Sequence, residues 1–176
     1  MPITRRHIGR DTLLKSRMQT ITNTVNCVGV MGKGVALKFK QAHKANFDDY
    51  VRRCDRNEVR PGVPYVFPAD AKRDKPELEL ILNFPTKNHW RNPSQIEWVE
   101  RGLQILADRY QEWDIKSLAL PPLGCGNGGL RWSDVWPLIQ HHLGELPIEI
   151  EVWVPDGEEV DEPKVAEEAQ LDLFSE

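Results

Sequence analysis

The sequence predicts a three-layer α/β/α domain with a mixed central sheet. Segments with strand-like and helix-like hydrophobic patterns alternate along most of the chain, as in α/β folds. Two glycine-rich loops, residues 26–34 and 124–129, each follow an apolar strand-like segment and lead into a helix-like one. The length of 176 residues, with 40% hydrophobic and 28% charged residues, suits one globular domain.

Residues 18–25 are rich in β-branched residues, which favour strands, and they run into the first glycine loop. From residue 35 to about 54 the apolar residues recur at helical spacing. We expect a break in this helix near residues 43–46.

A turn at Pro61–Pro64 precedes a short predicted strand over residues 65–67. Residues 78–84 form an apolar run typical of a largely buried strand, and Pro85 ends it. The helix predicted after residue 94 begins with a capping box, Ser94 to Glu97.

The predicted helix after this capping box places Ile96, Val99, Leu103, Leu106 and Tyr110 on one face. Residues 117–120 are a candidate central strand leading into the second glycine loop.

We expect Ser133 or Asp134 to cap a helix over residues 135–143, with Pro137 in its first turn. Residues 148–154 alternate apolar and polar positions, which predicts a last strand near a sheet edge.

The glycine loops point to an anionic ligand. Glycine lets backbone N–H groups turn toward an anion, and the positive end of a helix dipole adds attraction. Two such loops at the ends of neighbouring strands can hold a diphosphate from both sides, so a nucleotide-derived ligand is the first hypothesis. The plain alternative is a pair of tight turns that need glycine for a positive φ.

The first loop is not an ATP-binding P-loop, because Gly32-Lys33 is followed by Gly34 rather than Ser or Thr. It also lacks the GxGxxG pattern of a Rossmann cofactor site. The adjacent His141 and His142 point to different faces of a helix, and no ligand-spaced partners accompany them, so we expect no metal and no cofactor.

Three cysteines without CxxC spacing indicate a reduced, cytoplasmic protein. The N-terminus lacks the apolar stretch of a secretory signal, and no apolar run is long enough to span a membrane.

Charge is distributed unevenly along the chain. Residues 155–176 carry nine acids against one base, so this segment has a net charge of −8. The whole chain has 27 acids and 23 bases, which leaves 18 acids and 22 bases, or +4, for residues 1–154. We therefore expect a mildly basic domain over residues 1–154, suited to an anionic ligand or nucleic acid, followed by an acidic flexible tail.

Three segments, residues 23–34, 84–91 and 120–130, resemble motifs of macrodomains and look most like the DNA ADP-ribosyl glycohydrolase branch. That branch is similar to the eukaryotic terminal ADP-ribose protein glycohydrolase. The resemblance implies a mixed sheet between helices, with ADP-ribose in a cleft. It also implies an antitoxin activity: a cognate transferase toxin ADP-ribosylates bases of single-stranded DNA, and the antitoxin removes the ADP-ribose. By resemblance, the modified nucleoside is thymidine.

The resemblance implies that the first loop wraps the distal ribose and that the second cradles the diphosphate. Asn26 would hydrogen-bond the distal ribose near the scissile bond. The ADP-ribose-binding residues implied are Asp11, Thr12, Asn26, Gly29, Val30, Met31, Gly32, Lys33, Gly34, Thr86, Pro122, Leu123, Gly124, Cys125, Gly126, Asn127, Gly128, Gly129 and Leu130.

Lys87 is the candidate catalytic residue, because it follows the strand ending at Pro85 and matches the lysine implicated in cleaving the N-glycosidic bond at C1″. It can act as a nucleophile if its amine is partly neutral, or stabilise negative charge as an ammonium. The alternative is an exposed strand-end lysine without a catalytic role.

Two features depart from related macrodomains. The second loop has no carboxylate, as expected of the DNA-directed branch, so the proton-transfer partner stays unassigned. At the N-terminus, where many macrodomains have an Asp or Asn that contacts adenine, Thr12 aligns without a gap and Asp11 aligns with a one-residue adjustment.

Aromatic and basic residues flank the motifs and are candidates for contacts with DNA. His89, Trp90 and Trp132 suit stacking on an extruded base, although Trp132 equally suits the core of the following helix. Lys33, Arg91 and Arg131 are candidates for contacts with phosphates.

The tail ends with a motif that resembles the pentapeptide by which bacterial proteins dock on the sliding clamp. Its residues are Gln170, Leu171, Asp172, Leu173 and Phe174. The alternative is that its apolar residues fold back onto the domain's own surface.

The sequence thus favours a monomeric ADP-ribosyl glycohydrolase acting on DNA, with no membrane association. Two alternatives stay open: a non-catalytic ADP-ribose-binding module and an ADP-ribose-1″-phosphate phosphatase. Family antitoxins often carry a further toxin-binding domain, and this chain has only the tail after residue 154, so direct toxin neutralisation is not expected.

Overall fold

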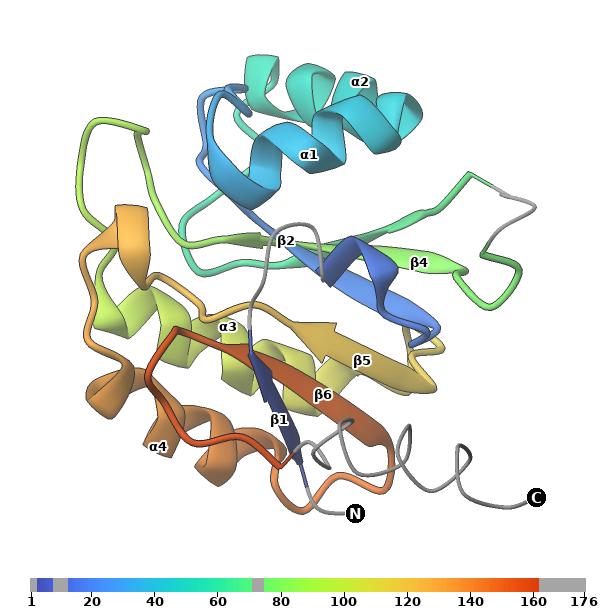
Figure 1. Cartoon of the computed structure of the whole chain (residues 1–176). Coiled ribbons are helices and arrows are strands. Elements are labelled where there is room, and N and C mark those ends of the chain that lie inside the picture. Colours follow the sequence, from blue (N-terminus) through green and yellow to red (C-terminus); the bar gives the residue numbers. More distant parts are fainter. Residues whose placement is uncertain (1–2, 8–12, 71–74, 162–176) are drawn as a thin grey trace, which may run out of the picture.

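A six-stranded sheet lies between two pairs of helices in the computed structural model, which describes residues 3–7, 13–70 and 75–161 (Figure 1). The strands are β1 (Thr4–His7), β2 (Thr20–Val25), β3 (Tyr65–Pro68), β4 (Leu80–Pro85), β5 (Ser117–Leu120) and β6 (Glu149–Val154). The helices are α1 (Gly34–Ala42), α2 (Lys44–Asp55), α3 (Ile96–Arg109) and α4 (Trp132–Leu143), with short 3₁₀ turns η1 (Leu13–Lys15) and η2 (Gly126–Gly128).

The sheet is mixed, with strand order β1-β6-β5-β2-β4-β3. Only β3 runs antiparallel, paired with β4; the other neighbouring strands are parallel. The carboxyl ends of β2, β4, β5 and β6 therefore meet at one edge of the sheet. Since β2 is bonded to both β4 and β5, the loops that follow these three strands are neighbours.

Alternate strand residues serve the two faces of the sheet. Leu82 and Phe84 of β4 belong to the core under α3 and α4. Ile81 of the same strand belongs to a second core with Ile21 of β2 and Phe39 of α1. The predicted three-layer architecture is confirmed, with α1 and α2 on one face and α3 and α4 on the other (Figure 1).

The predicted break in the first helix is confirmed. His43 separates α1 from α2, and its backbone N–H bonds back to the carbonyl of Phe39. The buried Asn46 of α2 exchanges two hydrogen bonds with Asn83 of β4, at 2.8 and 3.3 Å. This pair ties α2 to the strand that leads into the Lys87 segment.

The predicted side-chain caps are wrong for both later helices. Gln95 is the N-cap of α3 and makes no side-chain capping bond, while Ser94 is buried and donates its backbone N–H to Gly128 at 2.9 Å. Helix α4 begins at Trp132, earlier than expected, so Pro137 lies beyond its first turn. In both cases tertiary packing outweighs the local capping preference.

The N-terminal strand β1 was not predicted; it forms one edge of the sheet, and β6 lies next to it, near this edge as expected. The alternation in β6 is also misleading, because Glu151 is buried. Its carboxylate pairs with Arg6 at 2.8 Å and accepts a 2.8 Å hydrogen bond from Ser16. A polar residue at this position therefore faces a covering segment rather than solvent.

The first residues of the predicted tail contact the domain. Asp161 donates its backbone N–H to Arg5 at 2.9 Å and accepts a 2.8 Å bond from the Arg5 backbone N–H. The guanidinium of Arg5 lowers the pKa of Asp161, mainly through a side-chain hydrogen bond. The clamp-like motif at residues 170–174 lies outside the described residues. No helix in the described part of the chain is long and apolar enough to cross a membrane.

Candidate functional site

A cleft of about 740 Å³ opens at the carboxyl ends of β2, β4, β5 and β6. It lies at the strand edge where open α/β sheets bind ligands. The segments after these four strands all contribute to its walls. The lining residues are Thr24, Val25, Asn26, Val30, Gly32, Lys33, Gly34, Val35, Ala36, Thr86, Lys87, Trp90, Pro121, Pro122, Gly124, Cys125, Gly126, Asn127, Gly128, Pro155 and Asp156.

The first loop is held in shape by the side chain of Asn26. Its Oδ1 accepts hydrogen bonds from the backbone N–H groups of Val28 and Val30, at 3.0 and 3.4 Å, and its Nδ2 donates to the Val30 carbonyl at 2.7 Å. Gly29 has φ +83°, a value that favours glycine, so the tight turn needs this residue. One N–H of Nδ2 is left for a ligand.

The second loop has its own internal bonds. Leu130 N–H donates to the Gly124 carbonyl at 3.0 Å, and Gly129 N–H donates to that of Gly126 at 3.1 Å. Gly124, Gly126 and Gly129 all have positive φ values. Glycine is thus required for the loop's conformation as well as for access to its backbone N–H groups.

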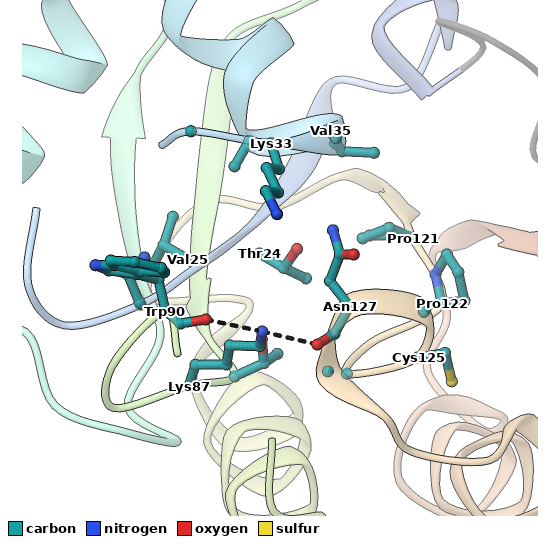
Figure 2. Close-up of a pocket in the computed structure, with 18 of the residues that line it drawn as sticks. Thr24, Val25, Lys33, Val35, Lys87, Trp90, Pro121, Pro122, Cys125 and Asn127 are labelled. Atoms are coloured by element: carbon teal, nitrogen blue, oxygen red, sulfur yellow. Dashed lines mark hydrogen bonds between the residues drawn. The ribbon is translucent and has the colours of Figure 1, made fainter. Parts of the chain in front are cut away.

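The two loops face each other across the cleft. Helix α1 begins at Gly34, so the first N–H groups of α1 have no carbonyl partner within the helix and the positive end of its dipole adjoins the cleft. Lys33 and the side-chain amide of Asn127 point into the space between the loops (Figure 2). These are the features of an anion site, and their spread along both loops suits a diphosphate.

Lys87 belongs to the segment after β4, and its side chain reaches the second loop. Its Nζ donates a 2.8 Å hydrogen bond to the Asn127 carbonyl and a 3.5 Å bond to that of Trp90 (Figure 2). No described carboxylate forms an ion pair with Lys87. Its backbone is fixed as well, because its carbonyl accepts from the Cys27 thiol at 3.3 Å and Thr86 N–H bonds to Val25. The Lys87 amine is therefore held at a defined point of the cleft.

Comparison with known proteins identifies this architecture. Residues 22–139 match the family model described as Macro domain. The chain belongs to the macrodomain family. This family assignment agrees with the resemblance seen in the three sequence motifs.

The macrodomain is 48% identical over 155 residues to a DNA ADP-ribosyl glycohydrolase of Thermus aquaticus, covering 88% of this chain and 41% of that protein. It is 42% identical over 150 residues to a DNA ADP-ribosyl glycohydrolase of Mycobacterium tuberculosis, covering 85% of this chain and 42% of that protein. The chain thus spans less than half the length of these curated relatives.

Solved structures agree with this placement. The macrodomain of Mycobacterium tuberculosis DarG has a TM-score of 0.80 and 40% identity, with 87% of this chain and 97% of that chain covered. The macrodomain of Thermus aquaticus DarG has a TM-score of 0.76 and 45% identity, with 87% and 98% covered. Thermosipho africanus DarTG in complex with ADP-ribose has a TM-score of 0.78 and 38% identity, with 84% and 41% covered.

The macrodomain's cysteines are not thiolates at neutral pH. Burial raises the pKa of Cys27 to about 12 and that of Cys125 to about 11. The thiolate is the nucleophilic form of cysteine, so burial of Cys125, which lines the cleft, disfavours a nucleophilic role for its thiol. Among the described residues, no group of three or more His, Cys, Asp or Glu side chains is arranged to hold a metal ion.

Aromatic and basic side chains gather where the β4–α3 segment meets the cleft. Trp90 is 45% exposed and lines the cleft, with the His89 ring stacked at 5.4 Å and the Arg91 guanidinium 4.6 Å from its ring centre. The expectation for Trp132 is corrected, because this side chain is buried in the core and stacks on Trp136 at 5.7 Å. Its ring is therefore not available to a base.

Fourteen of the residues predicted for the site line the cleft, and eight others that the structure describes do not. The eight are Gly29, Met31, His89, Arg91, Leu123, Gly129, Leu130 and Trp132. Met31 and Leu123 turn their side chains into the core, which explains their absence. Asp11 and Thr12 lie outside the described residues.

The sequence missed seven lining residues: Thr24, Val25, Val35, Ala36, Pro121, Pro155 and Asp156. Thr24, Val25 and Pro121 lie within the motifs 23–34 and 120–130, and Val35 and Ala36 directly follow the first motif, so all five could have been found from the motifs. Pro155 and Asp156 had no local signal, because only the parallel pairing of β6 with β5 brings the end of β6 to the cleft.

Proposed function

We propose that this macrodomain is a hydrolase that removes ADP-ribose from modified DNA bases, thereby counteracting a DNA ADP-ribosyl transferase. The relatives that carry this name cover most of this chain, and one relative joins the two activities in a DNA ADP-ribosyl transferase–DNA ADP-ribosyl glycohydrolase fusion protein from Thermosipho africanus. The observation that carries the proposal is the Lys87 Nζ in the cleft, held 2.8 Å from the Asn127 carbonyl of the second loop.

The diphosphate of ADP-ribose would lie between the two loops. It would accept hydrogen bonds from N–H groups of the second loop and from the first turn of α1. Lys33 points into the same space and offsets the diphosphate charge (Figure 2). This placement would bring the distal ribose toward Asn26 and Lys87, which line the cleft together with Trp90.

The reaction breaks the bond between C1″ and the base nitrogen. Water adds to C1″, the electron pair of the broken bond goes to the base nitrogen, and a proton from the water ends on that nitrogen. Lys87 would stabilise the negative charge that develops on the departing base. The other route is attack by a neutral Lys87 amine on C1″: the bond to the base breaks, the amine's proton ends on the base nitrogen, and water then hydrolyses the adduct and frees the lysine.

The modified nucleoside is thymidine in our proposal, and its base would stack on Trp90. Three of the four exposed large apolar residues in the described chain, Val28, Val30 and Trp90, belong to the loop after β2 or the segment after β4. These two segments are joined by the Cys27 N–H bond to the Asn88 carbonyl at 3.1 Å. An exposed aromatic ring beside a guanidinium suits single-stranded DNA, with the base on Trp90 and a phosphate near Arg91.

Release of ADP-ribose from a single-stranded oligonucleotide carrying ADP-ribosylated thymidine tests the proposal. The wild-type protein should release free ADP-ribose, and Lys87→Ala should slow release by about 10²-fold or more, since one preorganised charge contributes about this much. Binding of free ADP-ribose, measured by calorimetry, should change by only a few fold. Lys44→Ala is the matched control, because Lys44 is an exposed lysine that pairs with Asp48 on α2.

Further outcomes separate the alternatives. Substantial activity in Lys87→Arg supports the electrostatic role, whereas covalent attachment of ADP-ribose to Lys87, detected by mass spectrometry, supports the nucleophilic one. A wild-type protein that binds ADP-ribose and releases none from DNA would be a binding module. Release of phosphate from ADP-ribose-1″-phosphate, at the same rate in Lys87→Ala, would instead identify a phosphatase.

We also propose, from the motif at residues 170–174, that the tail docks on the sliding clamp.

A further inference from the structure

Tyr50 connects α2 to the first loop from a position that no loop motif includes. Its side chain is fully buried and belongs to a small core with Val25, Met31 and Val59. Its hydroxyl oxygen lies 2.8 Å from Asn26 Oδ1 and 2.9 Å from the Asn26 backbone carbonyl. One buried hydroxyl is thus placed against both oxygens of the residue that shapes the loop.

Three donors converge on Oδ1 of Asn26: the Tyr50 hydroxyl and the backbone N–H groups of Val28 and Val30. This arrangement orients the amide, because a flipped amide would set its Nδ2 donors against those groups. Nδ2 consequently faces the Val30 carbonyl; Asn26 lines the cleft, and the second N–H of Nδ2 makes no hydrogen bond to a described residue.

We infer that Tyr50 is a positioning residue, whose hydroxyl fixes the Asn26 amide in the orientation that presents its second N–H to the distal ribose. This inference rests on the proposed function: turnover of ADP-ribosylated DNA would depend on the shape of the first loop, and Tyr50 of α2 would maintain that shape. Tyr50 itself is buried and does not line the cleft, so the inference assigns it no contact with the substrate.

The chemistry of Tyr50 suits a permanent donor. Burial raises the pKa of Tyr50 above its ordinary value, so the hydroxyl keeps its proton at every physiological pH. Tyr65 offers a contrast in the same small core. Its pKa is also raised by burial, but its buried hydroxyl has no hydrogen-bond partner among the residues the structure describes.

Kinetics of Tyr50→Phe on the ADP-ribosylated oligonucleotide test the inference. The substitution keeps the packed ring and removes only the hydroxyl. We expect kcat to fall about tenfold, the effect of one buried hydrogen bond, with KM changing by less than about threefold. Assays run well below the unfolding midpoint of each variant keep loss of fold out of the rate. Tyr65→Phe, the matched control, should retain the wild-type kcat.

A double-mutant cycle with Asn26→Ala separates positioning from a general structural role. If Tyr50 acts through the Asn26 side chain, Tyr50→Phe has no further effect on kcat in the Asn26→Ala background. Equal losses in both backgrounds, or a wild-type kcat with only a lowered unfolding midpoint, would overturn the inference. Failure of the proposed function is distinct, since the wild-type protein would then release no ADP-ribose at all.

Discussion

At the scale of single residues, the glycines of the second loop are required for two different reasons: a positive φ at one position and a lack of space for a Cβ at another. A Cβ added at Gly126 would meet no atom within 4 Å, whereas one at Gly128 would fall 2.5 Å from Ser94 Oγ and 3.1 Å from Ser94 Cβ. Gly126 is required by its φ of +68°, and Gly128 by the close approach of Ser94. Two glycines two positions apart thus have different physical causes.

Gly128→Ala should displace the second loop. We expect a loss of about 1–3 kcal/mol in the free energy of unfolding from overpacking, and about tenfold weaker binding of ADP-ribose. Urea unfolding and calorimetry measure the two effects. In a Ser94→Gly background the clash is gone, so Gly128→Ala should cost little there; an equal loss in both backgrounds would contradict the assignment of Ser94 as its cause.

At the scale of elements, α3 approaches β4 closely at Gly102. A Cβ at this position would overlap the ring of Phe84, which is fully buried in the core under α3. Phe84 lies three residues before Lys87, so the contact between Gly102 and Phe84 also positions the start of the segment that carries Lys87. Glycine lowers helix propensity, and here the helix accepts that cost for closer packing.

Gly102→Ala should therefore destabilise the domain by about 1–3 kcal/mol, although alanine is the better helix former. Thermal or urea unfolding measures the change. Phe84→Leu provides a smaller partner, and we expect the added loss from Gly102→Ala to shrink in that background. A Gly102→Ala variant more stable than wild type would contradict the close contact between α3 and Phe84 of β4.

At the scale of the whole molecule, two partly buried thiols make the free energy of unfolding fall as the pH becomes alkaline. Burial raises the pKa of Cys27 to about 12 and of Cys125 to about 11, from an ordinary value of 9.0. The unfolded chain loses these protons from about pH 9 upward, while the folded domain keeps them to about pH 11–12. The unfolded state binds fewer protons in this window, so the free energy of unfolding falls as the pH rises.

Urea unfolding at pH 8, 9, 10 and 11 checks this expectation. The free energy of unfolding should decrease above pH 9, and Cys27→Ala should make the decrease shallower by at most about 1.4 kcal/mol per pH unit, the limit for one titrating group. Solvent screening of the partly exposed thiol reduces this value. Identical slopes for wild type and variant would contradict a raised pKa for Cys27.

Much of the fold could be predicted from local sequence patterns. The β-branched run of β2, the apolar run of β4 and the helical spacing in α1, α2 and α3 are properties of contiguous residues, and each element forms where its pattern predicts it. The caps of α3 and α4 and the edge strand β1 did not follow local preference. Ser94 packs against Gly128 instead of capping α3. Strand β1 is recognised only by its pairing with β6.

The sequence by itself determined the fold class, the two glycine loops and the lysine after β4, because turn chemistry and hydrophobic period are written in neighbouring residues. Only the tertiary structure decided which side chains meet. It placed Trp132 in the core, brought Pro155 and Asp156 to the cleft, and set the Tyr50 hydroxyl on Asn26. These contacts join residues that are distant in the chain, and they form only when parallel strands and packed helices bring them together.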